Sequence, residues 1–224
     1  MGSTAGAAAI VPAAGASRRM GKPKLLLPWG DSTVLESTLA ALREGGVASI
    51  VVVVAPAGPL AEWQPPVGVR IAVNPAPTAG MLSSILVGLA ALATTPDDEA
   101  LGADRGAAEP HADGGVSAPP RPEPDPLVVC PADLPALRPS TVAALLAAYR
   151  TTGGVVVPRQ GRRRGHPLLI PPRWQARMPE LTHHEGGLRR ILELAAGSVH
   201  EIAVDDPGSV RDVDTPDDYA RLVP

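Results

Sequence analysis

Phenylalanine is absent from this chain of 224 residues, and aromatic residues as a group make up only 2% of it. Hydrophobic residues still make up 45% of the sequence, so a core must be built from Val, Leu, Ile and Ala. That composition favours packed strands and helices over an aromatic-lined binding barrel. The length suits one α/β domain.

Other absences narrow the class of protein further. Cys130 is the only cysteine, which excludes an intramolecular disulfide and leaves any zinc site to His or carboxylate ligands. No apolar run approaches the roughly 18 residues that span a bilayer, and the first residues lack the basic segment of a signal peptide. The net charge of −3 argues against a nucleic-acid partner. We therefore expect a cytoplasmic protein with no membrane partner.

Apolar runs of strand length alternate with segments of helical periodicity. Strands are predicted at 7–11, 50–54, 69–73, 127–130, 155–157, 168–170 and 199–204, and helices at 33–43, 83–93, 140–149, 187–195 and 215–222. Ser140 or Thr141 is the expected N-cap of its helix. This alternation predicts an α/β fold with a mostly parallel sheet that is covered on both faces.

Residues 94–126 interrupt the alternation. The segment is dominated by Ala, Pro, Gly and acidic residues and has almost no large apolar side chains. Such a composition buries too little surface to offset the entropy of ordering the chain. We expect a single domain over residues 1–224, with 94–126 as a disordered surface insertion.

A small-residue loop follows the first predicted strand, with the sequence Ala-Ala-Gly-Ala-Ser-Arg-Arg-Met-Gly-Lys-Pro-Lys at 13–24. A tight turn of Ala and Gly exposes backbone N–H groups that suit phosphate oxygens. Arg19 and Lys24 would add positive charge. The loop has neither the Walker A pattern nor the Gly-x-Gly-x-x-Gly of dinucleotide folds. The alternative is an ordinary loop with solvated cations.

Acidic residues follow two later segments. Asp133 comes directly after a buried strand, where α/β sheets place ligands, so it suits a Mg²⁺ site or, alternatively, a turn. Asp212 and Asp214 have strand spacing and one of them could complete a metal site with Asp133. Asp214 could equally be the N-cap of the last helix. Cys130 is expected to be a buried core residue rather than a nucleophile.

The basic run at 162–164 is followed by Gly-His-Pro at 165–167. The three arginines fit an anion-binding patch or a solvated hairpin tip. His166 lies at the mouth of a predicted strand, where it would contact a substrate or play a structural role.

Together these segments resemble the nucleotidyltransferases of molybdenum cofactor maturation, above all the molybdenum cofactor cytidylyltransferases. The resemblance covers nearly the whole chain outside 94–126. The matching motifs are Ala-Ala-Gly-x-Ser-x-Arg-Met-Gly-x-Pro-Lys at 13–24, Leu-Leu-Leu-Pro-x-Gly at 25–30, Asn-Pro at 74–75, Gly-Met-x-Ser-Ser at 80–84, Pro-Ala-Asp-Leu-Pro at 131–135, Arg-Gly-His-Pro at 164–167, Gly-x-Arg at 187–189 and Asp-Val-Asp-Thr-Pro at 212–216.

The resemblance implies a three-layer, glycosyltransferase-A-like Rossmann-type fold and the transfer of a nucleoside monophosphate onto a phosphate monoester, with release of pyrophosphate. It assigns the catalytic roles to Arg19, Lys24 and Asp133, and Mg²⁺ binding to Asp133 and Asp214. Nucleotide binding falls to Ala13, Ala14, Gly15, Ser17, Lys24, Asn74 and Ser84. The acceptor, molybdopterin or its Mo-loaded form, would be met by His166 and Arg189.

The choice of nucleotide depends on the start of the loop. Cytidylyltransferases of this group tend to have Ala-Ala-Gly there, as in Ala13-Ala14-Gly15, so CTP is favoured over GTP. A molybdenum hydroxylase would be the partner that receives the product. The alternatives are a guanylyltransferase, a sugar-phosphate nucleotidyltransferase of the same fold, and a chaperone that inserts the molybdenum cofactor without making it. Pro12 departs from the family, which usually has Leu there.

Overall fold

The computed structural model describes residues 6–15, 17, 19–94, 126–181 and 187–224. Its main element is an eight-stranded sheet in which β8 (Arg163–Arg164) pairs with β7. The other seven strands lie in the order β10 (Val199–Ala203), β7 (Val155–Gln160), β9 (Leu168–Ile170), β6 (Leu127–Val129), β1 (Ala8–Pro12), β4 (Ser49–Val54) and β5 (Val69–Val73). Only β8 and β9 run antiparallel to their neighbours. The predicted mostly parallel sheet is confirmed.

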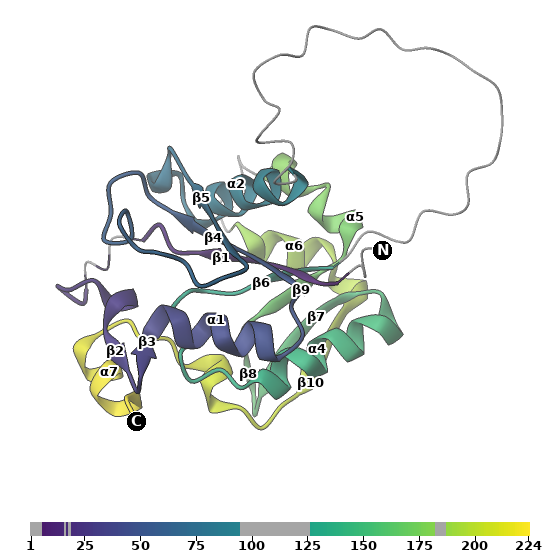
Figure 1. Ribbon diagram of the computed structural model, residues 1–224. Helices are drawn as coiled ribbons and strands as arrows, with labels where there is room; N and C mark the ends of the chain where they lie inside the picture. Colours follow the sequence, from purple (N-terminus) through teal and green to yellow (C-terminus); the bar gives the residue numbers. More distant parts are fainter. Residues whose placement is uncertain (1–5, 16, 18, 95–125, 182–186) are drawn as a thin grey trace, which may run out of the picture.

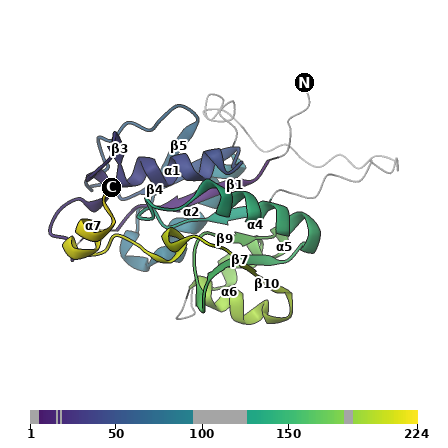
Figure 2. The same ribbon diagram turned by 90° about the horizontal axis from the view of Figure 1, so that it is seen from below.

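Helices cover both faces of this sheet (Figures 1 and 2). One face packs against α1 (Val34–Glu44) and α4 (Pro139–Thr152), and the other against α2 (Met81–Ala93), α5 (Pro172–Gln175) and α6 (Leu188–Leu194). Strand β4 shows the division, because Val52 belongs to the first core and Val51 and Val53 to the second. The three-layer Rossmann-like α/β architecture is as predicted.

Both cores are aliphatic, as the lack of phenylalanine requires. The largest fully buried side chains are Leu, Ile and Met. Close approach of backbones compensates for the missing aromatic volume. At Gly88 of α2, an added Cβ would lie 2.7 Å from Ile10 Cγ2 of β1, so glycine lets this helix pack directly on the sheet.

Short elements complete the fold. They are β2 (Pro28–Trp29), β3 (Ser32–Thr33), α7 (Pro216–Leu222) and the 3₁₀ helices η1 (Lys24–Leu26), η2 (Pro77–Ala79), η3 (Met178–Leu181), η4 (Ala196–Ser198) and η5 (Pro207–Val210). The arginines at 162–164 lie on the hairpin of β7 and β8, with Arg162 in the turn and Arg163 and Arg164 forming β8. No described helix is both long enough and apolar enough to span a membrane. The insertion predicted at 94–126 lies outside the described residues except at its two ends.

The prediction for the start of α4 was wrong. Its N-cap is Arg138, and Pro139 rather than Ser140 opens the helix. Thr141 is buried, and its hydroxyl donates to Asp206 Oδ2 at 2.7 Å. The Thr141 hydroxyl therefore contacts a carboxylate 65 residues away instead of capping the helix, which no local pattern indicates.

The strand order reverses at β1. From β1 the chain proceeds to β4 and β5 on one side, and then returns to place β6 on the other. The crevice outside the carboxyl ends of such strands is where open α/β sheets bind ligands. The loop at 13–24 and Asp133 both begin at these ends.

Candidate active site

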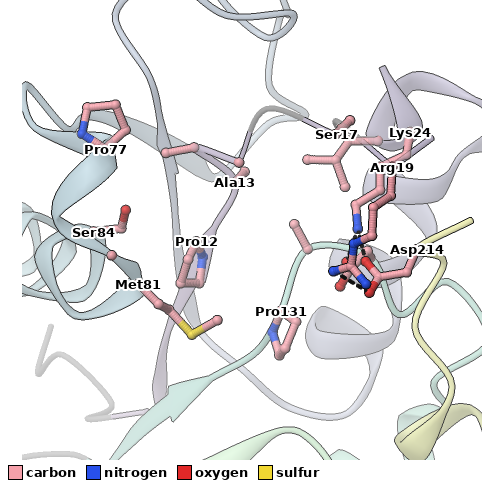
Figure 3. Close-up of a pocket in the computed structure, with 16 residues that line it drawn as sticks. Pro12, Ala13, Ser17, Arg19, Lys24, Pro77, Met81, Ser84, Pro131 and Asp214 are labelled. Carbon is pink, nitrogen blue, oxygen red and sulfur yellow. Dashed lines mark hydrogen bonds and ion pairs between the residues drawn. The ribbon is translucent and has the colours of Figure 1, made fainter. Parts of the chain in front are cut away.

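A cavity of about 430 Å³ opens at the carboxyl ends of β1 and β6 (Figure 3). We call it the main cavity. Its walls come from four segments: Pro12, Ala13, Ala14, Gly15, Ser17, Arg19, Lys24 and Leu25 after β1; Pro77, Gly80, Met81 and Ser84 around the start of α2; Pro131, Ala132 and Asp133 after β6; and Asp214 before α7. Most of the residues predicted to bind nucleotide or metal thus line one cavity.

The loop after β1 leaves the sheet without disturbing it. Pro12 is the last residue of β1, and the chain still bonds to β4 beyond it, because Ala13 N donates to Val53 O at 2.8 Å. Ser17 adopts φ 47°, a left-handed conformation that is uncommon for a residue with a side chain. Strain of this kind clusters at ligand sites, and Ser17 lines the cavity.

The first turn of α2 faces the cavity from the opposite side (Figure 3). Gly80 precedes the helix with φ 94°, which favours glycine, and no side chain caps the turn. Its N–H groups and the positive end of the helix dipole suit an anion. Asn74 is buried behind this turn and donates to Ser84 Oγ at 3.0 Å. Asn74 therefore positions Ser84 and does not itself line the cavity.

Three carboxylates converge beside the loop. One oxygen each of Asp133, Asp212 and Asp214 lies within 4.8 Å of the others, and we call this group the acidic trio. Three oxygen ligands at this spacing are a donor set that suits Mg²⁺ or Mn²⁺. Asp212 was weighed from its spacing to Asp214 but was not among the predicted site residues. Asp214 is not the helix cap, because Thr215 caps α7 in a capping box with Asp218.

Two cations from the loop reach the acidic trio. Lys24 Nζ donates to Asp133 Oδ2 at 2.5 Å and to Asp214 Oδ1 at 2.7 Å. Arg19 Nη2 lies 2.8 Å from Asp214 Oδ2, and Figure 3 shows both side chains pointing at that carboxylate. Burial would lower the pKa of Lys24, but the two carboxylates outweigh it and raise that pKa above 10.5. The hydrogen bond from Lys24 in turn lowers the pKa of Asp214.

Backbone contacts fix the segments that carry the acids. Val213 N, between the two later aspartates, donates to Asp133 O at 3.0 Å. Upstream, the buried Asp206 accepts from Arg138 N at 3.0 Å and Gly208 N at 2.9 Å, besides the bond from Thr141. A Cβ on Gly208 would lie 2.0 Å from Ala136 O. The acids are therefore held by packed backbone rather than by their side chains.

His166 and Arg189, the predicted acceptor-binding residues, do not line the main cavity. His166 N donates to Ser209 O at 2.7 Å, and its buried Nδ1 has no partner among the described residues. Burial lowers the pKa of His166, against the opposing effect of Asp133 and Asp212. Arg189 is exposed on α6, with its Nε 3.7 Å from Glu193 Oε1. His166 thus neighbours the acids, whereas Arg189 is not brought to them.

Cys130 is fully buried at the end of β6, and burial raises the pKa of its thiol. A thiol that stays protonated is a poor nucleophile. The expectation of a core residue is confirmed.

The fold and the site together define a nucleotidyltransferase with a Rossmann-like α/β fold. Residues 9–202 match the family described as the MobA-like NTP transferase domain, and the chain belongs to that family. This confirms the predicted class of enzyme and the broader family to which the sequence was compared.

Solved structures share the fold, and a curated relative is similar in sequence, over nearly the whole chain. Rv0371c from Mycobacterium tuberculosis H37Rv superposes with a TM-score of 0.74 at 27% identity, covering 100% of this chain and 99% of that one. A second structure of that protein, in complex with manganese, gives 0.69 at 25% identity, covering 97% and 98%. A curated relative named nicotine blue oxidoreductase, from Paenarthrobacter nicotinovorans, is 27% identical over 96% of this chain and 95% of its own length.

Proposed function

We propose that this nucleotidyltransferase transfers CMP from CTP to molybdopterin or Mo-molybdopterin, depends on Mg²⁺, and releases pyrophosphate. The observation that carries the proposal is the main cavity itself. It has a small-residue loop and an uncapped helix start on its walls, and two cations meet the acidic trio at one end. Triphosphate, metal and attacking phosphate need such a combination of donors, positive charge and carboxylates.

Donors and cations of the cavity would bind the triphosphate, and its carboxylates would bind the metal. The N–H groups of Ala14 and Gly15 and of the first turn of α2 bind phosphate oxygens, and Arg19 and Lys24 neutralise the triphosphate. Asp133 and Asp214, with Asp212, would hold Mg²⁺, which when bound supplies charge stabilisation and alignment of the phosphates. An oxygen of the acceptor phosphate forms a bond to the α-phosphorus as the bond to pyrophosphate breaks. No protein nucleophile is needed, so catalysis is positioning and electrostatic stabilisation.

The proposed preference for CTP depends on Ala14. A second cavity of about 440 Å³ lies beside the main one, and Ala13, Ala14 and Gly15 line both. The walls of the second cavity beyond them are small or apolar, mainly the segment at 57–60. We place the base there, with the methyl group of Ala14 at its entrance narrowing the space for a purine. Ala14→Gly removes that methyl group and should improve use of GTP relative to CTP.

The test is pyrophosphate release with each of CTP, GTP, ATP and UTP, with Mg²⁺ or Mn²⁺, and with the pterin acceptor. Turnover with CTP well above the others supports the proposal, whereas equal use of GTP or ATP contradicts the choice of nucleotide. Sugar phosphates at fixed CTP test the alternative acceptor. Asp133→Asn separates an enzyme from an insertion chaperone, because a chaperone would still bind and deliver the cofactor to a molybdenum hydroxylase.

The relative named as an oxidoreductase requires one further measurement. Oxidation of NADH or NADPH by an electron-accepting dye should be followed in the same preparations. Pyridine nucleotide turnover without any pyrophosphate release would overturn the proposed function.

A further inference from the structure

A separate cavity lies on the other side of the acidic trio. It has a volume of about 540 Å³ and is lined by Arg163, Val210, Arg211, Asp212, Asp218, Arg221 and Leu222. We call it the arginine cavity. It shares no lining residue with the main cavity. The two meet through the trio, because Asp212 lines one while Asp133 and Asp214 line the other.

Three arginines from three separate segments face this space: Arg163 from β8, Arg211 after η5 and Arg221 from α7. Arg221 already pairs with Asp218, at 3.0 Å from Nη2 to Oδ1. Arg163 and Arg211 have no side-chain hydrogen bond or ion pair to any residue within the described part of the chain. Their guanidinium groups keep all their donors for an incoming anion.

A nucleotidyltransferase must bring two anionic phosphates to one set of carboxylates. The cations of the main cavity, Lys24 and Arg19, serve the triphosphate. In-line displacement requires the acceptor to approach the α-phosphorus from the side opposite the leaving pyrophosphate. A second positively charged cavity that reaches the same trio through Asp212 meets that requirement.

We propose that the arginine cavity binds the phosphate monoester group of the acceptor, through Arg163 and Arg211 with Arg221 behind them. The assignment rests on the proposed function for its place in the reaction. The role of binding the acceptor, expected of Arg189 from the sequence, is thereby given to arginines that line a cavity next to the trio. A phosphate monoester bound there directs its oxygen toward the carboxylates, and the rest of the acceptor extends along the exposed β7–β8 hairpin.

Inorganic phosphate is the probe for this site, titrated by calorimetry into the metal-free and nucleotide-free protein. The double variant Arg163→Gln/Arg211→Gln should weaken the binding of phosphate by about tenfold or more, since each arginine contributes a charge-assisted hydrogen bond. Arg162→Gln is the control for loss of positive charge. It removes one charge, where the double variant removes two, from an exposed side chain next to Arg163 that does not line the cavity. Equal loss in the control and the double variant overturns the proposal.

CTP binding with Mg²⁺ separates this proposal from the proposed function. If the double variant loses phosphate but keeps wild-type affinity for CTP, the arginine cavity is a site distinct from the nucleotide site. Loss of CTP affinity in parallel shows that the arginines serve the triphosphate and overturns the inference. If the wild type binds no nucleoside triphosphate, the proposed function fails, while the contrast between the double variant and Arg162→Gln still decides whether an anion site exists. Thermal melts confirm that the variants fold.

Discussion

The two sides of the main cavity are built in opposite ways. The acidic side is held by packed backbone: Val213 bonds to Asp133 O, and Asp206 joins the start of α4 to η5. The loop side reaches across with long cationic side chains, and Lys24 and Arg19 contact the acids only through ion pairs. The carboxylates are thus fixed in place, while the cations can change partners when a triphosphate or a metal enters.

Removal of one fixed carboxylate should have the largest effect. Asp133→Asn keeps the shape of the acidic side but removes a charge that would hold the metal. We expect turnover to fall by about 10³-fold, or ~4 kcal/mol in transition-state stabilisation. Asp205→Asn is the control, since Asp205 is exposed and neither belongs to the trio nor lines the main cavity. Turnover of Asp133→Asn within tenfold of wild type would contradict a metal role for this residue.

Loss of Asp206, whose hydrogen bonds hold the acidic side, should destabilise that side without changing the charges of the trio. Asp206→Ala leaves three donors unpaired, on Arg138, Thr141 and Gly208, two of them in buried residues. We expect the free energy of unfolding to fall by about 3 kcal/mol, measured by urea denaturation. Gly208→Ala should also destabilise, because its Cβ would collide with Ala136 O. An unchanged urea midpoint in both variants would mean that the backbone contacts do not fix this side.

The cation of the loop should compete with a metal. Lys24 Nζ occupies the space between Asp133 and Asp214, so a divalent ion must displace it. Lys24→Met should bind Mn²⁺ about tenfold more tightly without nucleotide, and CTP more weakly. The measurement is calorimetric titration, with the exposed Lys22→Met as the matched control. Weaker Mn²⁺ binding in Lys24→Met would show that the lysine does not compete with the metal.

Acid should weaken the ion pair between Lys24 and Asp214. The pKa of Asp214 is lowered in the folded protein, so its contribution to stability is present above its unfolded value near 3.8. That contribution is lost as the pH falls through the lower folded pKa. Asp214→Asn should therefore show a flatter loss of thermal stability between neutral and strongly acid pH than the wild type does. If thermal stability falls with pH in parallel for the two proteins, the charge of Asp214 does not contribute to stability.

The smallest effect is expected at Arg19. Its side chain is 73% exposed, so the ion pair with Asp214 should contribute under about 0.5 kcal/mol to the stability of the protein. Arg19→Gln should leave the urea midpoint unchanged while weakening CTP binding severalfold. A drop in stability with unchanged CTP affinity would contradict this prediction and show that Arg19 stabilises the fold instead of binding CTP.

Much of the fold and part of the site could be predicted from local pattern. The aliphatic runs and helical periodicity gave nearly every strand and helix of the main sheet, because local spacing reports which face is buried. The loop residues Ala13 to Gly15, together with Lys24 and Asp133, were predicted from type and position after a strand, whereas the choice of Asp214 over Asp212 came from the family resemblance. Asp206 was not, because its partners at Arg138 and Thr141 are 68 and 65 residues away.

The sequence by itself determined the alternation of strands and helices, the aliphatic core and the chemical character of each loop, since all of these depend on neighbouring residues. Only the tertiary structure decided that Asp212 joins the trio, that Lys24 bridges two of its members, and that Arg163, Arg211 and Arg221 face one cavity. Each of these depends on segments far apart in the chain meeting at one edge of the sheet. The strand order and the backbone contacts of η5 bring them there, and no local pattern encodes either.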